Sequence, residues 1–409
     1  MANLCILGSH AVNGVAALHS ELLIKDLFKD FYELFPKKFQ NKTNGVTPRR
    51  WIACCNPELA KLYSEYLKSD DWLANLDKIK SLKEYAADPT FQKRWLEIKR
   101  NNKKRLIQWV QKNCNVTLNE DSLFDIMFKR IHEYKRQFMN ALYLIHRYLK
   151  IKDTPIEERK KWVPRTVLFG GKAAPGYLNA KKIIRLIGAI SNVVNNDKEI
   201  GDLLKVVFLP NYNVSLAEIV IPASEVSHHI STAGFEASGT SNMKFCLNGC
   251  LLLGTMDGAN VEIAEEIGDE NLFIFGARVH DIDKASARMK HLKPEEYFGP
   301  ELGRVFQAID DGMFGFKDEL KSLLDTIRFN NDFYLIGHDF GMFVEAQDKV
   351  DQLYKNQSEW VKKSILTATG CSKFSSDRTI MQYAKDIWDI KPVTIPKPSL
   401  QPETRQILQ

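Results

Sequence analysis

The sequence has few features of a secreted, membrane-bound or metal-binding protein. Its seven cysteines include no CxxC pair, which argues against both a disulfide framework and a zinc knuckle. No apolar run approaches the roughly 18 residues that a membrane span requires, and the first residues lack the basic region of a signal peptide. These absences favour a cytoplasmic protein with reduced thiols, no metal site and no membrane contact.

The charge of the chain is not strongly biased either. The 409 residues include 57 Lys+Arg and 51 Asp+Glu, a formal net charge of +6. Such a mild excess suits small anions better than a nucleic-acid groove. With 44% hydrophobic residues, the chain is long enough for one large or two ordinary domains with buried cores. We therefore expect a globular protein that binds no nucleic acid.

The clearest pattern present is an alternation of two kinds of segment after about residue 122. Short β-rich runs alternate with helical patterns, which is typical of βαβ units and of a parallel sheet covered on both faces. The predicted strands are 123–128, 166–169, 205–209, 251–253 and 272–275. Apolar residues at helical spacing follow the first two strands, over 138–149 and 183–194. The sequence therefore predicts an α/β fold with a doubly wound parallel sheet.

Additional helices are expected on either side of this sheet in the sequence. The first hundred or so residues are mostly amphipathic and helical in pattern. Near the other end, Ser375 and Ser376 are candidate N-caps of an amphipathic helix that continues to Trp388. The Pro-containing tail after Lys391 is expected to be loose. Within the sheet region, Asn248 and Gly249 are expected to end a helix between two buried cysteines.

Ligands of a doubly wound sheet bind at the carboxyl ends of its strands, so the loops there are the places to look for chemistry. These loops have unusual compositions. In chain order they read FKRIHEYKR, GGKAAPGY, PNYNVSLAE, EASGTSNMK and GTMDGANVE.

The segment EASGTSNMK places small residues where a loop turns into a helix. Exposed N–H groups at a helix start, beside a glycine that lets a ligand approach, form an anion site that a phosphate can occupy. Lys244 follows one turn later and, in apolar surroundings, could form a Schiff base with an aldehyde. A capped helix with a solvated lysine is the alternative, and spacing alone favours it.

The segment FKRIHEYKR places five basic residues within eight positions after an apolar strand. They are Lys129, Arg130, His132, Lys135 and Arg136. A solvated basic turn is the commoner meaning of such a run, but its place at the end of a strand favours anion binding. Together with the helix start near Thr240, this loop would supply enough positive charge for two neighbouring phosphate groups.

Three carboxylates near these loops, Glu236, Asp257 and Glu262, could each accept hydrogen bonds from sugar hydroxyls. A carboxylate beside a glycine turn is as often a capping or turn residue. No spacing pairs two of them as the acid and nucleophile of a glycosidase. No GxGxxG follows a predicted strand, which leaves little support for a dinucleotide-dependent oxidoreductase.

Long segments of the chain resemble the glycogen, starch and maltodextrin phosphorylases. EASGTSNMKFCLNG resembles the pyridoxal-phosphate signature of this family. KFQNKTNGVTPRRW, KRIHEYKRQ, GGKAAPGY, NYNVSLAE and GTMDGANVE occur in the family's order. The resemblance extends from Asn3 to about Trp388, and several long motifs in one order do not arise easily by chance.

This resemblance implies that the chain is the C-terminal, cofactor-binding part of a longer, two-domain GT-B enzyme with Rossmann-like domains. Residues 1–43 would be the closing segment of a preceding domain, residues 44–390 the pyridoxal-phosphate-binding domain, and residues 391–409 a loose tail. Family members hold their active site between the two domains. Catalysis is therefore expected only when the preceding domain adds its glycine-rich loop and its histidine.

The implied activity is that of an α-1,4-glucan phosphorylase, a glycosyltransferase. Inorganic phosphate takes the terminal glucose of glycogen, starch or a related glucan with retention, which gives glucose 1-phosphate. The implied cofactor is pyridoxal phosphate, whose 5′-phosphate is expected to exchange a proton with the substrate phosphate. A homodimer is a weaker inference from the same resemblance.

Residue roles are carried over only where the motifs match. The predicted catalytic residues are Lys129, Arg130, Lys135, Thr240 and Lys244. The residues predicted to bind the cofactor are Lys244, Lys129, Trp51, Tyr212, Gly239, Thr240 and Ser241. The residues predicted to contact the glucosyl unit are Asn44, Tyr134, Glu236, Ala237, Ser238 and Gly239. His132 and Tyr177 are predicted at the mouth of the site.

Two alternatives remain open on the sequence. One is a nucleotide-sugar glycosyltransferase of GT-B architecture, in which the basic loop would hold a diphosphate and no pyridoxal would be needed. The signature around Lys244 counts against it. The other is a non-catalytic fragment that binds only a cofactor or a partner.

Overall fold

The computed structural model describes residues 1–289, 292–329 and 331–393. A six-stranded parallel sheet forms its centre, with strand order β5-β4-β3-β6-β7-β8. The strands are β3 (Leu123–Phe128), β4 (Arg165–Gly170), β5 (Leu204–Leu209), β6 (Val226–His229), β7 (Leu251–Gly254) and β8 (Phe273–Ile274). The predicted doubly wound α/β fold is confirmed.

The strand order changes direction at the pair β3 and β6. The chain runs outward from β3 through β4 to β5, and then returns to place β6 on the free side of β3. Asp125 and Ile126 of β3 pair with Val226 and Ser227 of β6 in parallel register. In a doubly wound sheet, the crevice at the carboxyl ends of such a strand pair is the usual ligand site.

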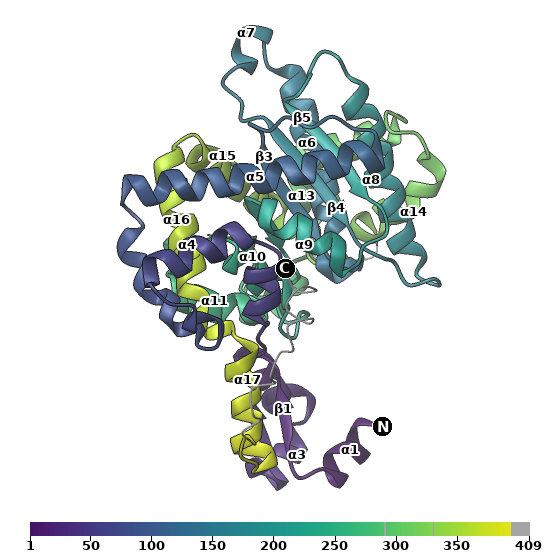
Figure 1. The fold of residues 1–409 in the computed structure, drawn as a ribbon. Coiled ribbons are helices and arrows are strands. Elements are labelled where there is room, and N and C mark those ends of the chain that lie inside the picture. The colour runs from purple at the N-terminus through teal and green to yellow at the C-terminus, as the bar shows by residue number, and fades with distance from the viewer. Residues whose placement is uncertain (290–291, 330, 394–409) are drawn as a thin grey trace.

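Helices cover both faces of the sheet (Figure 1). Alternate residues of β3 enter two separate cores, because successive side chains of a strand point to opposite faces. Leu123 and Met127 pack in the core with α6 (Gln137–Asp153), α8 (Leu178–Asn196), α13 (Pro294–Asp310), α14 (Lys317–Arg328) and α15 (Ile336–Tyr354). Phe124, Ile126 and Phe128 pack with α4 (Pro57–Leu67), α5 (Pro89–Cys114), α9 (Val214–Ala223), α10 (Ser241–Leu247), α11 (Ala259–Ile267) and α16 (Gln357–Gly370).

The two ends of the described chain lie side by side in a small lobe below the sheet domain (Figure 1). The N-terminal part contains α1 (Ala2–Gly8), β1 (Val12–Gly14), α2 (Ala17–Leu22), α3 (Lys29–Leu34) and β2 (Phe39–Asn41). Asn13 Nδ2 donates to Tyr383 Oη of α17 (Ser376–Tyr383) at 2.7 Å. Val46 and Ser375 form a parallel bridge. The helix predicted near residue 375 is confirmed, with Ser375 as its N-cap.

Most of the predicted elements lie within a residue or two of their observed bounds. The predicted strand 272–275 is shorter in the structure, and β6 was not predicted. The helix α10 ends at Leu247, followed by Gly249 with a φ of +71°, as expected. Two short helices complete the α-helices and strands of the described ranges, α7 (Ile156–Arg159) and α12 (Ile282–Met289), beside several 3-10 and π-helical segments. The predicted loose tail lies mostly outside the described residues.

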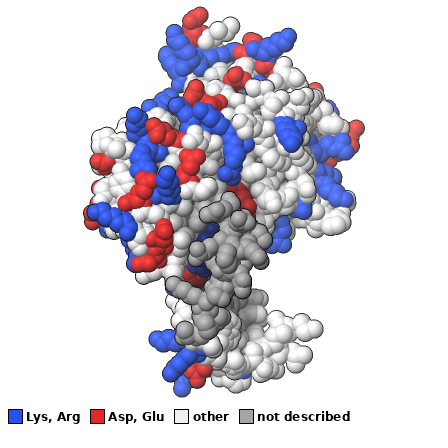
Figure 2. All heavy atoms as spheres, viewed as in Figure 1, with Lys and Arg blue, Asp and Glu red and all other residues white. Residues whose placement is uncertain are grey.

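Three further findings concern membrane-spanning helices, surface charge and the cysteines. No helix in the described ranges is both long and apolar enough to cross a membrane. Figure 2 shows Lys and Arg side chains interspersed with Asp and Glu over the face drawn, instead of gathered in one basic stripe. The seven cysteines are all free thiols.

Candidate active site

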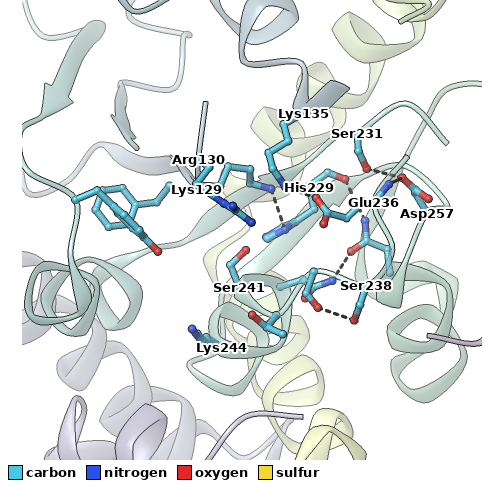
Figure 3. A pocket seen from close by; sticks show the side chains of 16 residues that line it. Lys129, Arg130, Lys135, His229, Ser231, Glu236, Ser238, Ser241, Lys244 and Asp257 are labelled. Carbon is cyan, nitrogen blue, oxygen red and sulfur yellow. Dashed lines mark hydrogen bonds and ion pairs between the residues drawn. The ribbon is translucent and has the colours of Figure 1, made fainter. Parts of the chain in front are cut away.

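A cavity of about 390 Å³ lies at the carboxyl ends of β3 and β6, where the strand order reverses. Its walls come from the loop after β3, the loop after β6 and the start of α10. In Figure 3 the basic side chains of the first loop lie across the cavity from α10. The predicted residues that line it are Lys129, Arg130, Lys135, Tyr212, Glu236, Ser238, Gly239, Thr240, Ser241 and Lys244.

Four residues predicted to bind the cofactor or the glucosyl unit do not line this cavity. They are Asn44, Trp51, Tyr134 and Ala237. Trp51 lies directly behind it, with its ring under Lys244, and Tyr134 Oη donates to Glu236 Oε2 at 3.2 Å. The main chain of Asn44 bonds to Val15 and Arg378. The structure therefore brings Trp51 and Tyr134 to the edge of the cavity and leaves Asn44 outside it.

His132 and Tyr177 form an aromatic pair near Tyr134. Their ring centroids are 4.9 Å apart, and the centroids of His132 and Tyr134 are 4.6 Å apart. Tyr177 Oη donates to Glu133 Oε2 at 2.6 Å. These rings lie beside the cavity and not within its lining, which fits their predicted position at a mouth.

The turn into α10 presents backbone donors to the cavity. Gly239 has a φ of +74°, in the left-handed region that favours glycine. In the described part of the chain, no oxygen accepts from the N–H groups of Gly239, Thr240 and Ser241. Unengaged N–H groups beside a helix start attract anions.

Lys244 lies one turn into α10, on the ring of a tryptophan. Its Nζ is 4.1 Å from the centroid of the Trp51 ring. Burial lowers the pKa of Lys244 below its ordinary value, because the charged form loses hydration. Among the described residues, no carboxylate forms an ion pair with this ammonium. A lysine with a lowered pKa is a better nucleophile toward an aldehyde at neutral pH.

The loop after β3 supplies three further cations. Burial, reinforced by Lys135, lowers the pKa of Lys129 to about 7. Lys129 Nζ lies 3.2 Å from His229 Nδ1. Lys135 forms an ion pair with Glu236. Arg130 is exposed and lines the cavity without a carboxylate partner among the described residues.

Asp257 holds the loop that carries Glu236. Its two oxygens accept from Ser231 Oγ at 2.7 Å and from the N–H groups of Gly234 at 2.9 Å, Glu236 at 2.9 Å and Gly258 at 3.0 Å. Burial raises the pKa of Asp257, although the Ser231, Glu236 and Gly234 donors oppose the shift. Of the two roles considered for Asp257, sugar ligand or turn residue, this geometry favours the turn residue, since its acceptor sites are used within the protein.

Glu262 likewise has a structural position. It accepts from Ala17 N at 3.0 Å and from Thr43 Oγ1 at 2.7 Å, and it pairs with Lys373 at 3.3 Å. It does not line the cavity. Glu262 joins the N-terminal lobe to α11, and the expectation that it binds sugar is not supported by this placement.

Comparison with known proteins identifies the family. A family model described as carbohydrate phosphorylase matches residues 1–390. The chain belongs to the carbohydrate phosphorylase family. The family predicted from the motifs is thereby confirmed.

Three curated phosphorylases show how much of a relative this chain represents. It is 54% identical to glycogen phosphorylase 2 of Dictyostelium discoideum over 97% of this chain and 39% of that protein. It is 50% identical to the chloroplastic/amyloplastic alpha-1,4 glucan phosphorylase L-2 isozyme of Solanum tuberosum, over 97% of this chain and 41% of that protein. The cytosolic alpha-glucan phosphorylase 2 of Arabidopsis thaliana is also 50% identical, over 97% of this chain and 47% of its own length. The chain thus spans less than half of these phosphorylases.

Several residues of the cavity were not predicted from the phosphorylase motifs. They are Phe128, His229, Ser231, Asn242 and Asn260. Asn260 Nδ2 donates to the main-chain oxygen of His229, and its Oδ1 accepts from Asn242 Nδ2, both at 3.0 Å. Asn242 and Asn260 belong to motifs that were recognised, so their spacing could have indicated them. His229 ends an unpredicted strand and Ser231 follows it, and no sequence signal placed them.

Proposed function

We propose that this chain carries the cofactor-binding and phosphate-binding part of an α-1,4-glucan phosphorylase. The observation that carries the proposal is one cavity that combines a desolvated lysine, three unengaged N–H groups and cations without carboxylate partners. A ligand that joins an aldehyde to a phosphate would satisfy all of these groups at once. Pyridoxal phosphate has this combination.

The donor set fits this cofactor. Lys244 would hold the aldehyde end, with Trp51 and Tyr212 beside the pyridine ring. Lys129 and the N–H groups of Gly239, Thr240 and Ser241 would hold the phosphate end. When bound, pyridoxal phosphate supplies a phosphate group that can exchange a proton with a second phosphate.

The remaining polar groups suit an inorganic phosphate and a sugar. Arg130 offers a planar fork of donors, and Lys135 offers a compact charge that Glu236 now pairs. If an incoming phosphate took over Lys135, the carboxylate of Glu236 would be released from its ion pair. It could then accept a hydrogen bond from a glucosyl hydroxyl. Tyr134 donates to the same carboxylate and would keep it oriented. The proposed substrates are therefore phosphate and the terminal glucose of an α-1,4-glucan.

The first experiment locates the cofactor. The 409-residue chain is incubated with pyridoxal phosphate, reduced with borohydride and mapped by peptide mass spectrometry. We expect a phosphopyridoxyl group on Lys244 and none at that position in Lys244→Ala. Lys99 is an internal control: burial lowers its pKa to about 8, but three carbonyl oxygens already accept from its ammonium. Labelling spread over other lysines, with none on Lys244, would refute the assignment.

A second experiment separates a catalytic part from a non-catalytic fragment. The chain is joined to the N-terminal remainder of the Dictyostelium relative, and glucose 1-phosphate formation from a glucan and phosphate is measured. We expect activity that Lys244→Ala abolishes. Cofactor binding without any phosphorolysis in the joined protein would support the non-catalytic alternative.

A further inference from the structure

The inner wall of the cavity contains a lysine and a histidine from the two strands at which the sheet reverses. Lys129 follows the last residue of β3, and His229 is the last residue of β6. The Nζ of Lys129 lies 3.2 Å from Nδ1 of His229, and Figure 3 shows the two side chains meeting. Within the described ranges, no other atom hydrogen-bonds to this ammonium. His229 therefore decides where the ammonium sits.

The second nitrogen of His229 is held by its own strand. Nε2 lies 2.6 Å from the hydroxyl oxygen of Ser227, two residues earlier on the same face of β6. An ammonium can only donate, so Nδ1 must accept from Lys129. The ring proton is then on Nε2, which donates to Ser227 and fixes the plane of the imidazole.

The surroundings keep this imidazole neutral. Burial, followed by the charge of Lys129, lowers the pKa of His229 well below its ordinary value, and His228 and Lys135 act in the same direction. The charge of Glu236 acts on Lys129 in the opposite direction and raises its pKa. From α10, the apolar ring of Phe245 packs against His229, with ring centroids 5.9 Å apart. Arg130, Lys244 and Asp257 line the same cavity.

We propose that His229 is a positioning residue for the cofactor phosphate, an inference that rests on the proposed function. Its neutral Nδ1 fixes the ammonium of Lys129 at the back of the cavity and leaves two N–H bonds for an anion. A carboxylate in this place would hold the lysine equally well but would cancel its charge and repel a phosphate. A neutral acceptor positions the cation and preserves its attraction for the phosphate.

The test compares two ligands that differ only in the phosphate. Dissociation constants for pyridoxal phosphate and for pyridoxal are measured on the 409-residue chain and on His229→Leu. We expect the variant to weaken pyridoxal phosphate binding by about tenfold, the lower range for a hydrogen bond to a charged group, and to leave pyridoxal binding unchanged. His229→Gln, whose amide oxygen can accept from Lys129, should recover most of the loss.

Two further variants separate positioning from packing. In a Lys129→Met background, His229→Leu should cause no additional loss, because the group that it positions is absent. Ser227→Ala should cause a smaller selective loss than His229→Leu. Equal weakening of both ligands in His229→Leu, or the same loss with and without Lys129, would show a merely structural role and overturn the proposal.

A readout without cofactor keeps this inference distinct from the proposed function. The pKa of Lys129 can be followed by its reactivity toward acetic anhydride across pH, with peptide mass spectrometry. His229→Leu removes the acceptor of the ammonium and should lower that pKa further. If the chain binds neither pyridoxal compound, the proposed function fails, and an unchanged pKa of Lys129 would then overturn the role of His229 as well.

Discussion

Two regions of this molecule contain several charged side chains close together. In one region the cations are paired with carboxylates, and in the other most of them, within the described ranges, are not. On one face of the sheet, two buried arginines meet two buried aspartates. Arg165 pairs with Asp125 at 3.0 Å and with Asp351 at 2.6 Å, and Arg147 pairs with Asp351 at 2.7 Å. The side chain of Arg165 is 0% exposed. Every charge in this network has an opposite charge from the protein itself.

In the cavity at the carboxyl ends of the strands, the cations are mostly without carboxylate partners among the described residues. In the part of the chain that the structure describes, only Lys135 among its cations pairs with a carboxylate. Lys129, Arg130 and Lys244 face the same space without such a partner. Cations that the protein leaves unpaired are available to a ligand, whereas paired cations hold the fold.

The pKa shifts of the two regions differ in the same way. Burial alone would raise the pKa of Asp351, but Arg165 and Arg147 outweigh burial, and its pKa is lowered. Burial lowers the pKa of Lys129 to about 7, Lys135 acts in the same direction, and the opposing charge of Glu236 does not outweigh them. The network therefore stabilises the charged form of Asp351. In the cavity, by contrast, keeping Lys129 charged lowers the stability of the folded protein.

The largest effect is expected from breaking the network. Arg165→Met keeps much of the volume but leaves Asp125 and Asp351 short of a partner, and removal of one member of a buried pair costs about 3–5 kcal/mol. Urea denaturation at pH 7 measures this loss. The matched control is Arg304→Ala, whose partner Asp153 is 55% exposed, and we expect a change below about 1 kcal/mol there.

The pH dependence of this loss follows from the carboxylates. A lowered pKa contributes stability above the unfolded value, and that stability is lost as pH falls through the folded value. Without Arg165, the pKa of Asp351 should rise, so that protonation relieves the penalty at moderately acid pH. The deficit of Arg165→Met should therefore be smaller at pH 4 than at pH 7. A deficit independent of pH would mean that lost packing, and not charge, is responsible.

The same contrast explains what the sequence could and could not predict. Five of the six central strands are apolar runs, and these were found. The strand β6 was not predicted because three of its four residues, Ser227, His228 and His229, are polar and yet buried. Their burial depends on tertiary partners, such as Asp125 for His228 and Lys129 for His229. Such partners are distant in sequence and leave no local periodicity.

The sequence likewise predicted one part of the candidate site and not another. The recognised motifs identified most cavity residues, because helix starts and basic loops have local signatures. They did not indicate which carboxylates remain free for a ligand. Asp257 was a candidate for binding sugar hydroxyls, with a turn or capping role as the alternative, and it accepts three bonds from the loop that contains Glu236 and one from Gly258. The three donors of that loop lie more than 20 residues from Asp257 in the sequence and meet it only when the chain is folded.

An intermediate effect is expected from the cavity's exposed arginine. Arg130→Ala should weaken the binding of inorganic phosphate by about tenfold, because a charge-assisted fork of donors is lost. The free energy of unfolding should change by less than about 0.5 kcal/mol, since no ion pair of the protein is broken. Isothermal titration with phosphate and urea denaturation measure the two quantities. A large loss of stability with unchanged phosphate affinity would place Arg130 with the network instead of the cavity.

The smallest effect is expected from Lys129, and it has the opposite sign in stability. Lys129→Met should raise the free energy of unfolding at pH 7 by about 1 kcal/mol, a value reduced for screening in an open cavity. The folded pKa of about 7 lies below the ordinary value of 10.5. Between these values the unfolded chain binds more protons, so the parent gains stability as pH rises.

The gain from Lys129→Met should therefore be fully present below pH 7 and disappear toward pH 10.5, the ordinary value for lysine. Urea denaturation at pH 7 and pH 10 measures it, with the exposed Lys198→Met as the control for loss of a surface charge. Phosphate binding should weaken in the same variant, because the cation that costs stability is the one that attracts the anion. If Lys129→Met instead destabilised the chain at pH 7, Lys129 would belong with the paired arginines, and the contrast between the two regions would not hold at this residue.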